Sequence, residues 1–184
     1  AKNLRAGDYL YIEEKEEDLV LSAQQKEREE GVSKDVEITG LAPKEIERLM
    51  VAHYISGFDL LNLRAKRIGP EQREAVNSAL RYLIGPEIMG ETSEFITLQN
   101  FLDTSDLSPR NVLRRMHIIA ASMLKSAVEA FLKGDGDLAR DVIGRDMEVD
   151  KLCLLIQREL TEGVKGRASH LEISPEESLQ YFAV

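Results

Sequence analysis

Two aspartates, Asp146 and Asp150, stand four residues apart in a stretch that has the apolar spacing of a helix. That spacing places both carboxylates on one side of a helix, one turn apart. Like charges at this spacing repel each other by about 0.2–0.5 kcal/mol, and a bound cation would relieve the repulsion. The residues therefore have two interpretations: a cation site, or a solvated acidic surface on a chain that is rich in acid.

The types of ligand residue limit which metal ions such a site could bind. Carboxylates and water favour magnesium, calcium, manganese or iron, whereas neutral histidine and thiolate favour zinc and other transition metals. Two carboxylates are too few for a tight site, so further ligands must come from another helix, a partner chain or a segment after Val184. The histidines are scattered singly, without a Glu-x-x-His pair, which argues against a ferritin-like di-iron core (His53, His117 and His170). No nucleophile or phosphate-loop signature occurs, and we expect no enzymatic activity.

The composition limits the class of protein. The 184 residues carry a formal net charge of -9, with 43% hydrophobic and 31% charged residues, as in an ordinary globular protein with a real core. The acidic charge opposes binding to phosphate backbones, so we expect no specific DNA binding by this chain alone. No leader and no apolar run of about eighteen residues is present, which predicts a cytoplasmic protein. The single cysteine, Cys153, is expected to be a buried small hydrophobe.

The first 34 residues predict a β-hairpin and a linker. Residues 8–13 and 19–22 are β-rich runs around the polar turn 14–18. We assign the whole hairpin region to residues 1–23. A lone hairpin is marginal in water, so it needs strands from elsewhere. Residues 24–34 are charged and poor in apolar side chains, which is typical of a linker.

Residues 35–104 predict a small domain with the order β-α-β-α-β-β. The spacing of apolar residues switches along the chain between the repeat of a strand and the repeat of a helix (strand 36–39, helix 43–55, strand 58–66, helix 70–84, strands 87–92 and 94–102). Pro43 suits the first turn of a helix, and Gly57 suits its C-terminal cap. This order implies a small sheet with helices packed on one face.

Residues 105–184 predict a helical domain. Ser108 and Pro109 mark a helix start, and a second helix opens at Gly136 after a linker short enough to force antiparallel packing. The two apolar stripes follow spacings of three and four (Val112, Met116, Ile119, Met123, Ala127 and Ala130; then Leu138, Val142, Val149, Leu152, Cys153, Ile156 and Leu160). A capping box at 174–177 predicts a third helix that is cut off at Val184, so we expect a piece of a longer protein. The fold class is therefore α+β and mostly helical.

The helix pair over 108–163, with Met123, Ala127, Ala130 and Gly134 ahead of the segment that holds Asp146 and Asp150, resembles the PhoU repeat. That repeat is a three-helix half of the fold of phosphate-uptake regulators. The family carries an E/D-x-x-x-D motif at which metal ions, often iron or zinc, gather in clusters. Asp146 and Asp150 match this motif residue by residue. The resemblance implies a second copy of the motif on the next helix, which this chain does not reach.

The amino-terminal residues 4–12 and 19–21 look like the second half of an AbrB/SpoVT-type swapped-hairpin domain. Archaeal PhoU-like regulators join such a domain to a helical region, and their middle part is similar to residues 55–59 and 83–88. AbrB-type domains bind DNA as dimers through basic loops of the first hairpin, which this chain lacks. The resemblance thus implies DNA binding only in a longer protein.

Two hypotheses follow. In the first, the protein regulates phosphate uptake as a homodimer or higher oligomer: the helical region binds metal and contacts a phosphate transporter or sensor kinase, and the amino-terminal part contributes transcriptional control. In the second, the helical bundle is a carboxylate-bridged metal enzyme or metal store. The absence of paired histidine ligands favours the first. Iron and zinc follow from the resemblance, whereas magnesium and manganese suit the carboxylates.

Overall fold

The computed structural model describes residues 11–15, 18–22, 31–103, 108–165, 167 and 177–178. Contacts within the chain divide it into two units, Ala1–Gly31 and Val32–Val184.

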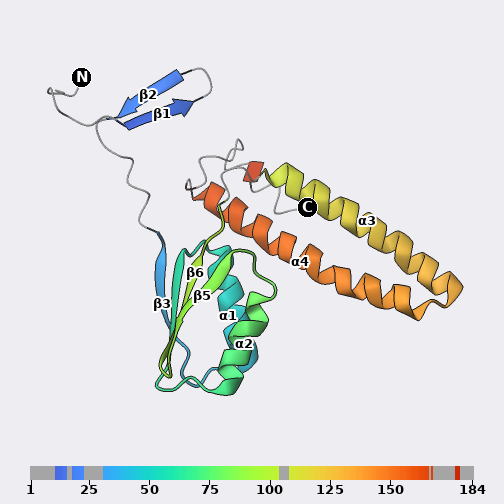
Figure 1. The fold of residues 1–184 in the computed structure, drawn as a ribbon, viewed down its shortest axis with the longest axis horizontal. Helices are drawn as coiled ribbons and strands as arrows, with labels where there is room; N and C mark the ends of the chain where they lie inside the picture. The colour runs from blue at the N-terminus through green and yellow to red at the C-terminus, as the bar shows by residue number, and fades with distance from the viewer. Residues whose placement is uncertain are drawn as a thin grey trace. The chain divides into compact units, whose positions relative to one another are not determined.

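The first unit contains the hairpin predicted from sequence. Strand β1 (Tyr11–Lys15) pairs antiparallel with β2 (Asp18–Ser22), and Lys15 lies opposite Asp18 (Figure 1). The prediction of a hairpin is confirmed, but its strands include residues 14, 15 and 18, which were predicted as part of the turn. Charged residues at 14, 15 and 18 therefore belong to the ladder. Charged residues are common on edge strands, where they discourage pairing with other chains.

The second unit begins with a four-stranded sheet covered on one face by two helices (Figure 1). Its elements confirm the predicted order (β3 Ser33–Glu37, α1 Pro43–Ile55, β4 Leu60–Arg64, α2 Pro70–Leu80, β5 Pro86–Glu91 and β6 Phe95–Asn100). The strands lie in the order β3-β4-β6-β5, with β3 parallel to β4 and the other pairs antiparallel. Helix α1 makes the crossover that a parallel pair requires. The α+β fold class is thus confirmed.

Alternation along the strands separates a buried face from a polar face. Leu61 and Leu63 of β4 are fully buried against the helices, as are the other core residues (Ile38, Ile46, Met50, Tyr54, Phe58, Val76, Ile96 and Leu98). On the other face, the Asn62 side chain donates to Asp35 (2.8 Å) and accepts from Thr97 (2.9 Å). These three residues are register partners across β3, β4 and β6, so one polar row ties three strands together.

Most strand boundaries of the sheet differ from the sequence prediction by one or two residues, and two boundaries differ by more. Strand β3 begins at Ser33, inside the stretch predicted as linker. Helix α2 ends at Leu80 and not at 84, because the chain tightens into three i→i+3 hydrogen bonds that turn Leu83 into the core. The following Gly85 adopts a φ of +103°, which lets the chain enter β5.

The second unit continues with a pair of long packed helices, α3 (Pro109–Lys133) and α4 (Gly136–Val164). Their starts and ends confirm the sequence prediction. The link is short because Gly134 takes a left-handed conformation (φ +64°) and Asp135 caps α4 by accepting from the Asp137 and Leu138 amides. Ser108 stands at the N-cap of α3, although its side chain makes no capping hydrogen bond.

The predicted third helix lies outside the described residues, apart from Glu177 and Ser178, which are helical. Among the helices that the structure describes, none has the length and apolar content needed to cross a membrane.

Candidate functional site: an acidic pair and a domain junction on helix α4

The predicted acidic pair lies on the exposed surface of α4. Asp146 and Asp150 are both exposed and one helical turn apart, as the spacing predicted. The neighbouring Arg145 of α4 forms an ion pair with Asp141 (2.9 Å), one turn earlier on the same helix, and not with the acidic pair. Within the described part of the chain, no group of three or more His, Cys, Asp or Glu side chains is arranged to hold a metal. Among the residues that the structure describes, two carboxylates therefore come together without a further ligand.

The acidic pair continues a row of side chains that lines a hollow between the helices. Ala139, Ile143, Asp146 and Asp150 follow one another at spacings of four, three and four along α4. Ala139 and Ile143 line a hollow of about 490 Å³ whose other walls are mostly apolar (Ala127, Ala130, Phe131, Gly134, Asp135, Gly136 and Val142). We call this side of the helix pair, from the hollow to Asp150, the open seam.

The opposite side of the helix pair is closed by polar contacts. Arg115 of α3 pairs with Glu148 of α4 at 2.5 Å, and Arg145 Nη1 lies 3.4 Å from Ser122 Oγ. Helical geometry puts Arg115 and Ser122 on one side of the contact between α3 and α4, and the hollow on the other. The helix pair is thus sealed along one side and open, apolar and acidic along the other. An amphipathic helix that leaves apolar side chains exposed is typical of a surface that contacts another segment or molecule.

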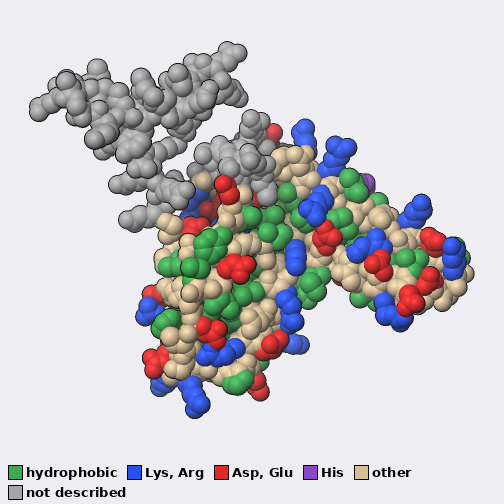
Figure 2. Space-filling view, in the orientation of Figure 1, with side chains coloured by type: hydrophobic (Ala, Val, Ile, Leu, Met, Phe, Trp, Pro, Cys, Tyr) green, Lys and Arg blue, Asp and Glu red, His purple; other side chains and the backbone are tan. Residues whose placement is uncertain are grey.

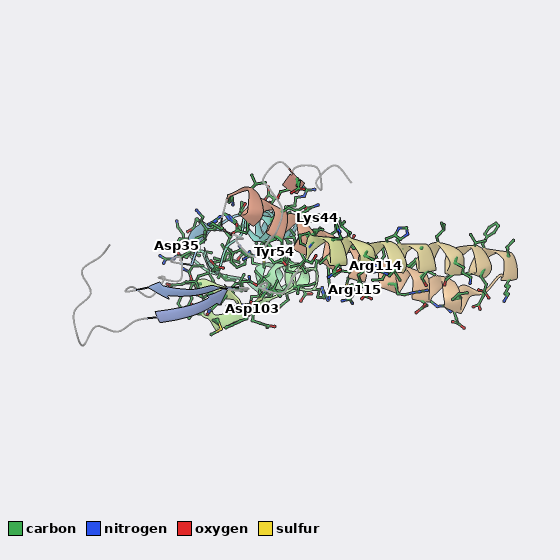
Figure 3. All side chains as sticks on the ribbon, turned by 90° about the horizontal axis from the view of Figure 1, so that it is seen from above. Asp35, Lys44, Tyr54, Asp103, Arg114 and Arg115 are labelled. Carbon is green, nitrogen blue, oxygen red and sulfur yellow. The ribbon has the colours of Figure 1, made fainter. Side chains whose placement is uncertain are left out.

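A second site was not predicted from the sequence: a buried arginine that joins α4 to the end of α1. Arg158 is 5% exposed, and its guanidinium donates to the carbonyls of Tyr54 (3.1 Å) and Phe58 (2.9 Å). It also lies 5.3 Å from the centre of the Tyr54 ring and 3.5 Å from Asp59. Figure 3 shows Tyr54 inside the sheet domain, close to the end of α4. A cation at the carbonyl end of a helix is favoured by the helix dipole.

The next turn of α4 contacts the same segment. Gly57 has a φ of +81°, and a Cβ at this position would overlap the carboxylate of Glu162. Lys165 donates to the Ser56 carbonyl at 2.7 Å, and Arg167 pairs with Glu162 at 2.9 Å. Arg158, Glu162 and Lys165 thus hold the 54–59 segment along one side of α4. We call this arrangement the junction.

Burial in the junction shifts two ionisation equilibria. Burial raises the pKa of Tyr54 to about 12, although the nearby Arg158 charge opposes the shift. The Tyr54 hydroxyl donates to the Ile84 carbonyl at 2.9 Å, which also fixes the turn before β5. Burial likewise raises the pKa of Glu162 above its ordinary value, against the attraction of Arg167 and Lys165. The junction therefore holds a neutral phenol and a carboxylate that is costly to ionise.

A sequence signal for the junction exists in retrospect. Leu155, Arg158 and Glu162 repeat at spacings of three and four, beside the stripe that faces α3. Leu155 and Arg158 are both buried, so the second half of α4 is covered on two sides. The 55–59 segment was singled out by its resemblance to the middle part of PhoU-like regulators, but no residue pattern linked it to α4.

Comparison with known protein families places the helix pair in a recognised domain. Residues 113–182 match the PhoU domain, a range that includes most of α3 and all of α4. No curated protein matches the chain, and no solved structure does. The predicted PhoU resemblance is therefore confirmed for this range. The acidic pair, the open seam and Arg158 all belong to the PhoU domain.

Proposed function

We propose that this protein is a PhoU-like regulator of phosphate uptake and homeostasis, cytoplasmic and not an enzyme, that acts through contact with other proteins. The observation that carries the proposal is the PhoU domain at residues 113–182. The open seam supports it, because an apolar helix surface next to an acidic row suits protein contact better than catalysis. A phosphate transporter or a sensor kinase is the partner that the family resemblance implies.

The regulatory proposal is tested by phosphate uptake in the organism of origin. Deleting the gene should alter uptake in phosphate-rich medium, and restoring the wild-type gene should reverse the change. Transcript levels of transport genes in the same strain separate the modes of action, since contact with a transporter changes uptake alone, whereas contact with a sensor kinase or transcriptional control also changes transcripts. Uptake and transcripts that match the parent strain in both rich and depleted medium would refute the proposal.

We also propose that Asp146 and Asp150 bind a metal ion weakly. Their exposure and one-turn spacing support the proposal, and their oxygen ligands suit magnesium, manganese or ferric iron, with zinc and iron implied by the family. Two carboxylates predict weak binding, unless a second copy of the chain or residues outside the described range complete the ligand set. A homodimer or higher oligomer would supply such ligands.

Thermal melting in the presence of metal tests this site. A cation that binds only the folded state raises the melting temperature with the logarithm of its concentration. We expect such a rise for the wild type in millimolar Mn²⁺ or Fe³⁺ and none for the Asp146→Ala, Asp150→Ala double variant. Asp137→Ala, which removes an exposed carboxylate from the same helix, is the matched control. Equal shifts in all three proteins would exclude binding at the acidic pair.

A carboxylate-bridged metal enzyme on the helix pair is the alternative function. Such sites draw carboxylates and histidines from several facing helices. The acidic pair provides two carboxylates from one helix, and His117 is the one histidine of α3, which favours the regulatory proposal. Transcriptional control through an AbrB-like amino-terminal part rests on the sequence resemblance of the hairpin.

A further inference from the structure

Helix α3 carries a second apolar stripe on the side that faces away from α4. Its members follow the spacings four, three, four, three and four, and all are exposed (Arg114, Ile118, Ala121, Lys125, Val128 and Leu132). The three large apolar side chains among them are 58%, 51% and 77% exposed, for Ile118, Val128 and Leu132 respectively. We call these six residues the outer stripe.

The apolar side chains of the outer stripe should be buried by a segment other than α4 and other than one that fills the open seam. Residues 118–132 of α3 are apolar on most sides, and a helix of this kind is normally buried on more than one face. Helical geometry places the outer stripe opposite the residues that contact α4 and to one side of the open seam. A segment that fills the seam would therefore leave Val128 and Leu132 exposed. The alternating three and four spacing is that of a helix that packs along a second helix.

The charge on this side of α3 is positive, although the chain as a whole is acidic. Arg114 and Lys125 belong to the stripe, Arg110 lies one turn before it, and the stripe contains no acid. Among the described residues, neither Arg110 nor Arg114 forms an ion pair. Figure 3 places Arg114 on the half of α3 nearer the sheet domain, and Figure 2 shows basic, acidic and hydrophobic side chains next to one another along the helix pair. This surface thus favours a negatively charged partner.

We propose that the outer stripe binds an amphipathic helix of a partner protein that carries acidic side chains beside its apolar row. The stripe spans about 27 Å, so the partner segment has about 18–20 residues. A second copy of the stripe does not fit, because it would bring Arg114 and Lys125 toward like charges. A membrane surface fits less well, because helices that lie on membranes carry their bases on the polar face, whereas Lys125 lies in line with the apolar residues.

This inference extends the proposed regulatory function by naming the chemistry of the partner. The two fail separately, because binding in solution does not depend on a response to phosphate.

Fluorescence anisotropy with two labelled peptides tests the inference on the full chain. The probe is a 21-residue helical peptide with leucine at its a and d positions and glutamate at e and g. The comparison peptide has lysine in place of each glutamate. We expect the glutamate peptide to bind at least about tenfold more tightly than the lysine peptide. Raising the salt concentration should weaken binding of the glutamate peptide.

Variants locate the binding surface. Leu132→Ser and Arg114→Glu should each weaken binding of the glutamate peptide about tenfold or more, as expected for apolar and charge-complementary contacts. Met89→Ser, at a side chain of β5 that is 55% exposed and lies outside both helices, should bind as the wild type does. Circular dichroism of each variant confirms that it is folded.

Four results would overturn the inference. Equal affinity for both peptides, or unchanged affinity in Leu132→Ser, shows that the outer stripe does not select an acidic helix. Binding to anionic lipid vesicles that Leu132→Ser abolishes, without binding of the peptide, assigns the stripe to a membrane. A wild-type dimer that Leu132→Ser converts to a monomer assigns it to a second copy.

Discussion

Replacing Arg158 by methionine should destabilise the protein by about 3 kcal/mol, because the arginine holds α4 to the end of α1. Methionine keeps an apolar stem of similar length, so the packing around the stem is largely preserved. What is lost is the guanidinium, which is buried and donates to two carbonyls at 3.1 and 2.9 Å. Each hydrogen bond from a charged donor contributes about 1.5–3 kcal/mol.

The two carbonyls differ in what remains to them after the substitution. The Tyr54 carbonyl also accepts from the Gly57 amide at 2.9 Å, so it keeps a partner. The Phe58 carbonyl loses its guanidinium donor and is left in a buried environment, which costs about 1–3 kcal/mol. Removal of the buried charge itself offsets part of the loss, since a buried guanidinium is expensive to desolvate. These terms together give the figure of about 3 kcal/mol.

Urea unfolding followed by circular dichroism measures the effect. Arg158→Lys keeps the charge but not the planar fork, and should lose about 1–2 kcal/mol. Arg114→Met, at an exposed arginine of α3, is the matched control and should change stability by less than about 0.5 kcal/mol. If Arg158→Met also separates the helix pair from the sheet domain, unfolding will occur in two transitions. A loss below about 1 kcal/mol in a single transition would refute the role assigned to the guanidinium.

Three further predictions concern the same junction. The pKa of Glu162 is raised in the folded state, so ionising this carboxylate at a pH above its ordinary pKa of 4.5 destabilises the fold. Glu162→Gln should therefore raise the melting temperature at pH 7 and leave it unchanged at pH 3.5. A lower melting temperature of the variant at pH 7 would contradict this. With a pKa of about 12, Tyr54 should still be protonated at pH 11. In a pH titration followed by ultraviolet absorbance, the wild type should show a tyrosine ionisation step above pH 11 that Tyr54→Phe lacks. Gly57→Ala should destabilise the protein by about 1 kcal/mol or more, because alanine resists positive φ and its Cβ displaces Glu162, whereas Gly144→Ala, at an open helical position, should stabilise it.

The elements with strong local signals were predicted from the sequence. Helix α1 has the predicted bounds, because Pro43 fixes its first turn and Gly57 supplies the positive φ just after its end. Strand β4 was predicted from the alternation of Leu61 and Leu63 with polar residues, and both leucines are fully buried. The end of α2 was misplaced because tertiary contacts decide it. Local propensity favours helix up to Ile84, but Tyr54 bonds to the Ile84 carbonyl and Leu83 turns into the core.

The acidic pair could be predicted from the sequence, whereas the junction could not. The exposure of Asp146 and Asp150 follows from their position beside an apolar stripe, which is a property of one helix. The burial of Arg158 depends on carbonyls that lie 104 and 100 positions away in the sequence. An arginine within a helix is normally solvated, so its residue type argues against burial. Only the packing of α4 on the end of α1 explains why it is inside.

The two halves of α4 therefore do different work. From Leu152 to Leu160 the helix packs against α3 through Leu152 and Ile156, and against the sheet domain through Leu154 and Arg158. Before Asp150 it contacts α3 through Arg145 and Glu148, and its exposed surface includes the open seam. Local stability follows the density of buried contacts, so the second half of α4 is anchored while the first half is free to adjust. The acidic pair proposed to bind a metal accordingly lies on the half of α4 that can respond to binding without disturbing the sheet domain.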